Sequence, residues 1–320
     1  MRQGFSRATV VTLLTTALVL APAPWILAWV LRGGQYAFRI TTLMLVNATY
    51  AVAFNLIFGH TKQLFLCVGA LAGSSAYLAV VLERDLGWPA LLTTGLGLLF
   101  AAGLGGLVSY VSVRRGLGVI FVGIVTLAVS LIFQNLLLGF RRYTNGETGI
   151  DTHGLGIGLG DRVVAYYVFV GLLLLALAVY ALLMGSPAGM AFRALSGDEL
   201  AAELAGIDVT RYKVLAAAVG SAVIGLAGAL FSDYNGFINP SIYALAQVDI
   251  VVLIVLIMGG MRTLLGPVIG AVVFAAIDHV VRPFGQVTVL VYGVFLIVLF
   301  VAFREGLVPV LRRAARLPIP

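Results

Sequence analysis

Reactive and metal-binding side chains are scarce in this sequence. Cys67 is the single cysteine, so no disulfide can form within the chain. The three histidines, His60, His153 and His279, are scattered without the spacing of metal ligands. No nucleophile–base pair stands out either, and an enzymatic function is therefore disfavoured. We expect neither a metal site nor a cofactor.

Charged residues are also rare. They make up 10% of the 320 residues, against roughly a quarter in ordinary soluble domains. Apolar residues make up 61%, and they form repeated runs of about eighteen residues or more, enough to cross a bilayer core. We therefore predict an all-α polytopic membrane protein. The net charge of +7 then reflects Lys and Arg on the cytoplasmic side rather than nucleic-acid binding.

A phosphate-binding loop is missing as well. The pattern G-x-x-x-x-G-K-[ST] does not occur, and Lys62 and Lys213 are the only lysines. The chain therefore has no means of cradling ATP phosphates through such a loop. If ATP drives this protein, hydrolysis must come from another polypeptide.

The hydropathy pattern predicts about ten membrane-crossing helices, with no soluble domain between them, so that residues 1–320 form one transmembrane domain. The glycine-rich ninth segment is open to a partly re-entrant interpretation. Arg2, Arg7 and a small-residue stretch around Ala23 imitate a cleaved signal, but the apolar run continues to Val30 and we expect a retained first helix. The expected spans are 9–31, 37–58, 64–82, 89–112, 117–140, 163–184, 213–231, 246–260, 264–281 and 286–303.

The distribution of basic residues predicts the orientation. Of the 20 Lys and Arg residues, thirteen fall on one side of these spans and seven on the other. The richer side is assigned to the cytoplasm, which places both termini and the loop 186–212 there. The longest outer loop, 141–162, contains glycines that do not fit G-x-G-x-x-G. We expect a flexible extracytoplasmic loop.

The cytoplasmic loop is unusually polar for this chain. Residues 186–213 read SPAGMAFRALSGDELAAELAGIDVTRYK and carry seven charged side chains. Ser186 followed by proline predicts one helix start, and Ser196 with Glu199 fits a capping box at a second. Gly206 suits the left-handed residue that ends this second helix, of about nine residues, and Asp208 is placed to cap the span that follows.

The second short helix has an apolar stripe. Leu200, Leu204 and Ile207 recur at i, i+4 and i+7, beside Glu199 and Glu203. Two interpretations stay open at this point. The stripe lies against the protein's own helix ends, or it is presented to a soluble partner in the cytoplasm.

The loop and the following helix, SPAGMAFRALSGDELAAELAGIDVTRYKVLAAAVGSAVIGLAGAL, resemble the EAA loop of bacterial ABC-importer permeases. The resemblance is to branched-chain amino-acid permeases of the LivH/LivM type, and most to the LivM side. VIFVGIVTLAVSLIFQN at 119–135, YTNGETGI at 143–150 and VLIMGGMRTLLGPVIGAVVF at 255–274 extend it. FNLIFGHTKQLFLCVGALAGSSAY at 54–77 departs from the family block, because Lys62, Phe65 and Cys67 stand where small or hydroxyl residues are usual.

The resemblance implies that the loop is a coupling helix docking in a groove of an ATPase subunit. The alanine pair of the motif falls on Ala201 and Ala202 and its glycine on Gly206, whereas Leu200 stands where the motif begins with an acid. The implied coupling residues are Arg193, Ser196, Glu199, Leu200, Ala201, Ala202, Glu203 and Gly206.

Polar residues within the spans are candidates for the translocation path. Asn55, Gln134 and Asn135 are amides that can also hydrogen-bond between helices, and we favour that structural role for them. Asp249 lies near one end of the eighth span, where a charge is costly. Its alternatives are a place on the path and a structural partnership with a buried amide or arginine.

The resemblance implies the type II-like permease subunit of an ATP-driven ABC importer in a bacterial or archaeal plasma membrane. The implied partners are two cytoplasmic ABC ATPases, a homologous second permease in a heterodimer and an extracytoplasmic solute-binding protein. Branched-chain amino acids are the default substrate, with urea and short amides open. The alternative is a self-sufficient secondary transporter or channel, which would more often show paired intramembrane ionisable groups than Asp249 alone.

Overall fold

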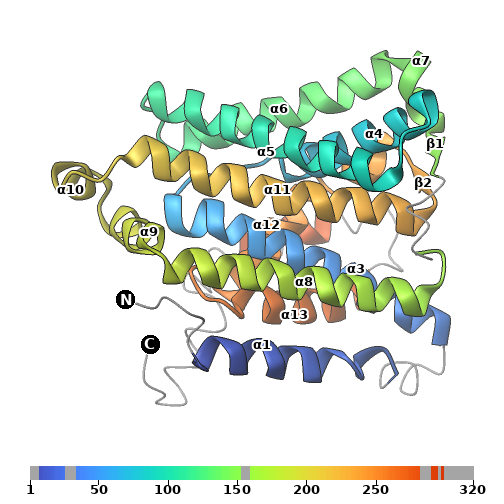
Figure 1. The fold of residues 1–320 in the computed structure, drawn as a ribbon, viewed down its shortest axis with the longest axis horizontal. Coiled ribbons are helices and arrows are strands. Elements are labelled where there is room, and N and C mark those ends of the chain that lie inside the picture. Colours follow the sequence, from blue (N-terminus) through green and yellow to red (C-terminus); the bar gives the residue numbers. More distant parts are fainter. Residues whose placement is uncertain (1–6, 26–33, 153–158, 282–289, 295–296, 299–320) are drawn as a thin grey trace.

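The computed structural model describes residues 7–25, 34–152, 159–281, 290–294 and 297–298. This part of the chain is almost entirely helical (Figure 1). By length and composition, five of its helices can cross a membrane. They are α3 (Gly34–Phe54) with the π-helical turn η1 (Asn55–Gly59), α5 (Ala90–Arg114), α6 (Val119–Gly139), α8 (Arg162–Gly185) and α11 (Val209–Asn235).

Four further helices lie at other predicted spans, and all but the second of them are short. They are α1 (Arg7–Leu20), α4 (Val68–Leu86), α12 (Asp249–Gly259) and α13 (Gly266–Val281). With 11 residues, α12 is about 16 Å long at 1.5 Å per residue, roughly half of a bilayer core. The expected span 286–303 lies largely outside the described residues, and so does the end of the first, 9–31. The prediction of an all-α polytopic fold is confirmed.

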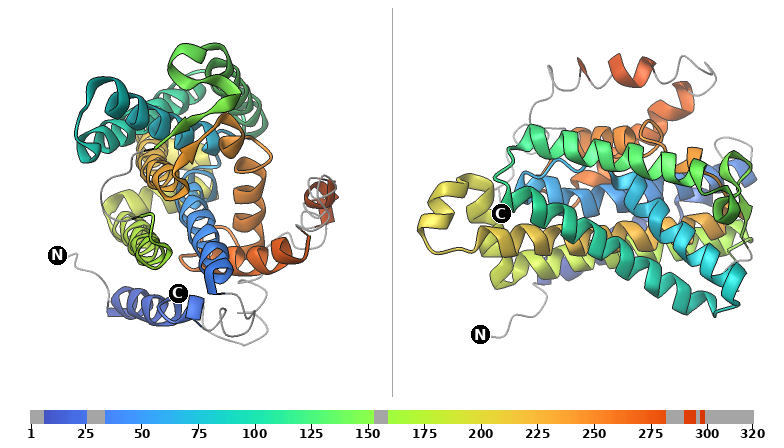
Figure 2. Two further views of the ribbon diagram at one scale, coloured as in Figure 1. Left: turned by 90° about the vertical axis from the view of Figure 1, so that its right-hand side faces the viewer. Right: turned by 90° about the horizontal axis from the view of Figure 1, so that it is seen from above.

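Helix α11 lies at the centre of the bundle. It packs on one side against α4 and α5 and on the other against α3, while α3 also contacts α8, α12 and α13 (Figures 1 and 2). Helix α1 lies at the periphery against α8. Side chains of α3, α4 and α12 form much of the buried core, whereas α5 and α6 expose long apolar faces, as expected of helices that face lipid.

Two glycines show how closely the backbones approach. A Cβ atom at Gly270 of α13 would lie 2.0 Å from the carbonyl oxygen of Val255 in α12, and one at Gly69 of α4 would lie 2.3 Å from that of Tyr243. Real side chains do not occupy such positions, so only glycine permits these contacts. Packing of this kind holds helices together in lipid, where no hydrophobic force acts between them.

The loop 141–162, which the sequence predicts to be extracytoplasmic, is folded rather than flexible over the residues described. Helix α7 (Arg141–Thr144) and the 3-10 turn η2 (Gly146–Thr148) lead into the strand β1 (Ile150–Asp151). This strand pairs antiparallel with β2 (Phe237–Ile238), placing Ile150 opposite Ile238. The prediction of a flexible loop was therefore wrong for 141–152, because both isoleucines are buried and anchor the pairing. Residues 153–158 lie outside the described part.

Candidate coupling loop and solute path

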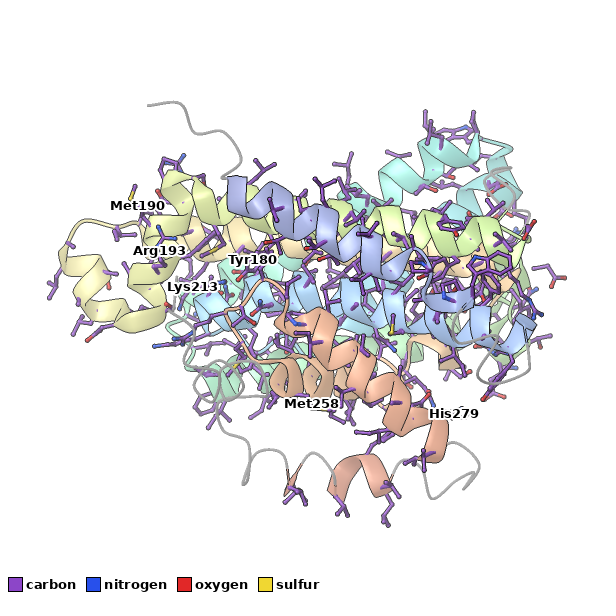
Figure 3. All side chains as sticks on the ribbon, turned by 90° about the horizontal axis from the view of Figure 1, so that it is seen from below. Tyr180, Met190, Arg193, Lys213, Met258 and His279 are labelled. Carbon is purple, nitrogen blue, oxygen red and sulfur yellow. The ribbon has the colours of Figure 1, made fainter. Side chains whose placement is uncertain are left out.

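Helices α9 (Pro187–Gly197) and α10 (Glu199–Leu204) form a bent projection at one end of the bundle, here called the elbow. Figures 1 and 2 show it at the end opposite β1 and β2, and Figure 3 places Met190 and Arg193 there. Pro187 occupies the first turn of α9, as the sequence predicts. Ser186 does not cap it, because its Oγ donates to the carbonyl of Leu183 instead.

The bend is made by Asp198 and not by the predicted capping box. Asp198 adopts an extended backbone, and its Oδ1 accepts the N–H groups of Leu200 (2.9 Å) and Ala201 (3.2 Å). Ser196 is still helical in α9 and donates to the carbonyl of Arg193. The capping-box prediction was therefore wrong by two residues. Helix α10 begins later than expected and spans 6 residues rather than about nine.

The end of the elbow follows the sequence prediction. Gly206 has a φ of +86°, a left-handed conformation that strongly favours glycine. Asp208 then caps α11, since its Oδ1 accepts the N–H of Arg211 at 2.9 Å. The turn between α10 and α11 is thus fixed at both ends by local chemistry.

The apolar stripe of α10 is turned away from the protein. Leu200 is 66% exposed and Leu204 is 81% exposed, whereas Ala202 on the other face is 4% exposed. Ile207 is partly buried and packs against the core. Of the two interpretations left open by the sequence, packing of Leu200 and Leu204 on the chain's own helix ends does not describe this structure.

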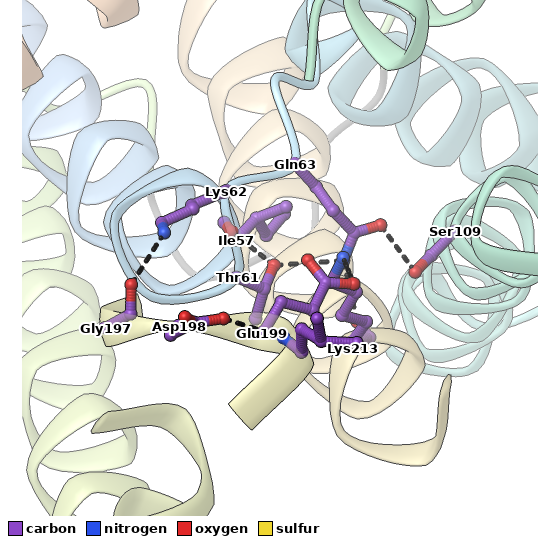
Figure 4. A network of polar contacts seen from close by, with 10 residues as sticks. Ile57, Thr61, Lys62, Gln63, Ser109, Gly197, Asp198, Glu199 and Lys213 are labelled. Atoms are coloured by element: carbon purple, nitrogen blue, oxygen red, sulfur yellow. Dashed lines mark hydrogen bonds and ion pairs between the residues drawn. The ribbon is translucent and has the colours of Figure 1, made fainter. Parts of the chain in front are cut away.

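A polar network ties the elbow to the membrane helices (Figure 4). Lys213 Nζ, in α11, donates to Glu199 Oε1 at 2.6 Å, and Lys62 Nζ donates to the carbonyl of Gly197 at 3.2 Å. Gln63 donates to the carbonyl of Lys213 and accepts the hydroxyl of Ser109 in α5. The elbow is therefore linked to α11, to α5 and to the turn that joins α3 with α4.

Helix α9 is anchored by aromatic contacts. Phe192 is fully buried, and its ring lies 6.4 Å from that of His60 and 6.1 Å from that of Tyr212. His60 Nε2 in turn lies 2.6 Å from the hydroxyl of Tyr180 in α8. Arg193 donates to the carbonyl of Met184 at the end of α8. These contacts join α9 to the end of α8, to the start of α11 and to His60 after η1.

The three residues that depart from the family block at 54–77 line neither of the two cavities described below. Lys62 reaches the elbow, while Phe65 and Cys67 are fully buried in the core. The role of Lys62 was missed by sequence reasoning. Its partner is 135 residues away, although Lys62 is one of only two lysines and both contact the elbow.

Two of the candidate path residues hold helix junctions together. Asn55 Nδ2 donates to the carbonyl of Thr263, and its Oδ1 accepts the N–H of Arg262, so Asn55 fastens η1 to the loop before α13. Asp249 is 1% exposed and accepts the backbone N–H of Gly69 at 3.0 Å and the hydroxyl of Ser130 at 3.3 Å. Its carboxylate thus lies at the first turn of α4, where negative charge is favoured.

The other two amides differ from one another. Asn135 is exposed and donates to the carbonyl of Leu131 in its own helix. Gln134 lines a cavity of about 430 Å³ beside the 3-10 turn η3 (Pro240–Tyr243), and its Nε2 is buried without a hydrogen-bond partner in the described part of the chain. The structure does not bring the four candidates together.

A helical body with five helices long and apolar enough to cross a membrane, and with a helical elbow projecting from one end, is that of a polytopic membrane protein. The chain belongs to the family described as branched-chain amino acid transport system / permease component, whose family model matches residues 36–303.

Similar proteins carry names of the same kind. The high-affinity branched-chain amino acid transport system permease protein LivM of Escherichia coli is 28% identical over 95% of this chain and 76% of its own length. The xylose transport system permease protein XylH of Escherichia coli is 25% identical over 68% of this chain and 71% of its own length. The ribose import permease protein RbsC of Bacillus subtilis is 29% identical over 49% of this chain and 50% of its own length. No solved structure matches this chain.

The chain is therefore a membrane permease subunit of the ABC-importer class for small solutes, and a transport component rather than an enzyme. It is a multi-pass protein of the inner membrane. Permeases of this class associate with ATPase subunits and a binding protein.

Proposed function

We propose that this chain is one half of the translocation body of an ATP-driven importer for branched-chain amino acids or related small polar solutes, and that the elbow couples it to the ATPase. The observation that carries the proposal is that α10 exposes apolar side chains while residues beside them are bonded to the membrane helices. Leu200 and Leu204 face outward, while Glu199 and Gly197 beside them are held by Lys213 and Lys62.

The elbow has the properties of a docking site for a soluble ATPase subunit. Helix α10 has 6 residues, about 9 Å of helix, which is short enough to act as a rigid knob. Its exposed leucines provide apolar area for a groove, and Glu203 beside them is also exposed. A displacement of α10 passes through the Glu199–Lys213 ion pair to α11 and through Gly197 to Lys62 below α3. Rigid-body motion of this kind is how domain movement reaches membrane helices.

We assign the partner proteins to the two opposite ends of the helical bundle. Two ATPases bind the cytoplasmic end that carries the elbow, and a solute-binding protein docks at the opposite end, near β1 and β2. A homologous second permease completes the path in a heterodimer. Both termini lie in the cytoplasm, and about ten spans form a type II-like body from residues 1–320.

The substrate assignment is supported by the relatives. LivM is named for branched-chain amino acids, and it is similar over most of this chain. RbsC and XylH are named for ribose and xylose and match shorter parts of it. Urea and short amides stay within the range of small polar solutes.

Reconstitution tests the proposal. The purified permease pair, the ATPases and the binding protein in proteoliposomes should take up L-leucine only when ATP is supplied to the ATPases. Leu204→Glu should abolish both uptake and binding of the ATPase, because a charge replaces the most exposed leucine of α10. Leu86→Glu is the matched control, since Leu86 is also exposed (55%) but ends α4 far from the elbow.

Two results would contradict the proposal. One is ATPase binding that survives Leu204→Glu. The other is uptake by the permease alone, without ATPase, which would favour a self-sufficient carrier or channel.

A further inference from the structure

A cavity of about 610 Å³ opens at the end of the molecule opposite the elbow. It is bounded by α3 from Tyr36 to Tyr50, the end of α11, the segment 237–248 and the end of α13. His279 lines it, and Figure 3 places that residue far from Met190 and Arg193 of the elbow. None of the residues proposed above for coupling lines this cavity.

One face of α3 gives the cavity a polar wall. Arg39, Leu43, Asn47 and Tyr50 line it and follow one another at intervals of four, four and three residues, which keeps them on a single face of the helix. From Arg39 to Tyr50 the stripe runs about 16 Å along the helix axis. It therefore leads from the exposed Arg39 to the buried Tyr50.

The inner end of this stripe has an unused hydrogen-bonding group. Tyr50 is 2% exposed, and its hydroxyl is buried without a hydrogen-bond partner in the described part of the chain. A buried hydroxyl in this state carries a desolvation cost that a polar ligand would remove. The hydroxyl is thus a second observation, independent of the cavity, that points to a solute at this place.

Opposite charges line the same space. Arg39 offers a planar guanidinium that suits a carboxylate. Asp278, on α13, lines the cavity as well and already accepts the hydroxyl of Tyr292, but a carboxylate has further lone pairs with which to accept an ammonium group. Met44 and Phe274 add apolar surface to the cavity wall. This combination fits a zwitterion with an apolar side chain better than it fits an uncharged sugar.

We propose that this cavity is a subsite for an α-amino acid on its way from the binding protein into the membrane path. The carboxylate of the amino acid pairs with Arg39, its ammonium group with Asp278, and the hydroxyl of Tyr50 receives the polar end of the solute as it moves inward. The inference rests on the proposed function and adds to it the residues that recognise the solute.

The test uses the complete importer in proteoliposomes, with L-leucine as probe, and measures uptake together with ATP hydrolysis stimulated by the binding protein. Arg39→Gln should lower the leucine taken up per ATP hydrolysed by about tenfold or more, since a charge-assisted contact is lost. Arg39→Lys should retain part of the uptake, because the charge remains. Arg142→Gln is the matched control: Arg142 is an exposed cation of α7 and does not line the cavity.

A second pair of variants tests the inner end. Tyr50→Phe should lower uptake several-fold with ATP hydrolysis retained. Tyr77→Phe is its control, since the Tyr77 hydroxyl is also buried without a partner in the described part of the chain but lies outside the cavity. Equal effects of the two changes would reduce Tyr50 to a packing residue.

The outcomes separate this inference from the proposed function. Unchanged leucine uptake in Arg39→Gln, with a functioning wild type, overturns the subsite and leaves the importer assignment standing. Uptake of ribose or xylose but not leucine by the wild type overturns the subsite and the amino-acid substrate, and leaves the ATP-driven importer standing. A fall in uptake and hydrolysis together, with Arg39→Lys equally impaired, would indicate a folding role for Arg39 and would also overturn the subsite.

Discussion

Lys213 Nζ donates to Glu199 Oε1 at 2.6 Å, and this ion pair joins the first turn of α10 to the first turns of α11. The two side chains differ in environment: that of Lys213 is 10% exposed and that of Glu199 is 44% exposed. The lysine end of the pair is thus buried in the bundle, and the glutamate end is accessible from outside it. The pair offers a direct test of whether the elbow transmits force.

Neutralising this pair should uncouple transport from hydrolysis. Lys213 is largely buried, so removal of its counter-charge has a cost; Glu199→Gln keeps an amide oxygen that can accept from Lys213 and should lower the thermal unfolding temperature only modestly. Leucine uptake per ATP hydrolysed should fall several-fold, because α10 then moves without pulling α11. Exchange of the charges, Glu199→Lys with Lys213→Glu, should restore part of the uptake.

Asp85→Asn provides the control for this prediction. Asp85 pairs with Arg84 at 2.7 Å at the end of α4, away from the elbow. The same loss of uptake in Asp85→Asn and Glu199→Gln would contradict a specific role of the elbow pair.

Two substitutions of Lys62 distinguish the effect of its side-chain hydrogen bond from the effect of its strained backbone conformation. Its φ is +55°, a conformation that costs a non-glycine residue about 1–2 kcal/mol. Lys62→Gly removes this strain and the bond to Gly197, whereas Lys62→Ala removes only the bond. Both variants should lower uptake per ATP, and Lys62→Gly should unfold at a higher temperature than Lys62→Ala in detergent. Retained uptake in both variants would mean that transport does not need the contact between Lys62 and Gly197.

Gly206 should tolerate substitution according to backbone preference rather than size. Its φ is +86°, and a Cβ atom there would meet no other atom within 4 Å. Gly206→Asn should therefore be milder than Gly206→Ala, and Gly206→Val the most damaging, because asparagine enters the left-handed region most readily and β-branched residues least. Uptake should follow this order while the amount of permease in the membrane stays constant. An order that follows side-chain volume would indicate a crowded docking surface instead.

Local signals in the sequence predicted much of the elbow. Pro187 and Gly206 carry conformational preferences that act within one turn, and Asp208 needs only the N–H of Arg211 three residues away. The boundary at Asp198 was missed because Ser196 and Asp198 are both good caps. The choice between them depends on where α9 stops packing, which local sequence does not encode.

Non-local contacts account for the rest of what was missed. The pairing of Ile150 with Ile238 joins segments of two residues each, too short to give a strand pattern. The contact of Lys62 with Gly197 and the cavity beside α3 likewise depend on how distant helices pack. Hydropathy predicts that such helices exist but carries no information on which of their faces meet.

Asp249 offers a choice between a structural role and a place on the path. Its carboxylate accepts the N–H of Gly69 and the hydroxyl of Ser130, and no other group in the described part of the chain bonds that N–H outside its own helix. Asparagine keeps an acceptor at this position, so Asp249→Asn should lower the unfolding temperature only slightly and retain uptake. Asp249→Leu leaves the Gly69 N–H unsatisfied in the interior of the bundle, which costs about 1–3 kcal/mol. We expect a clear loss of stability in that variant.

Thermal unfolding in detergent and leucine uptake in proteoliposomes distinguish the two roles of Asp249. If the carboxylate of Asp249 is structural, uptake in the variants should fall only in proportion to their loss of stability. Ser130→Ala should then cause a smaller loss of stability, with a correspondingly smaller loss of uptake. If Asp249→Asn instead abolished uptake at unchanged unfolding temperature, the negative charge itself would be needed during transport. Asp249 would then join Arg39 and Asp278 on the path, because a charge kept at this depth is otherwise expensive.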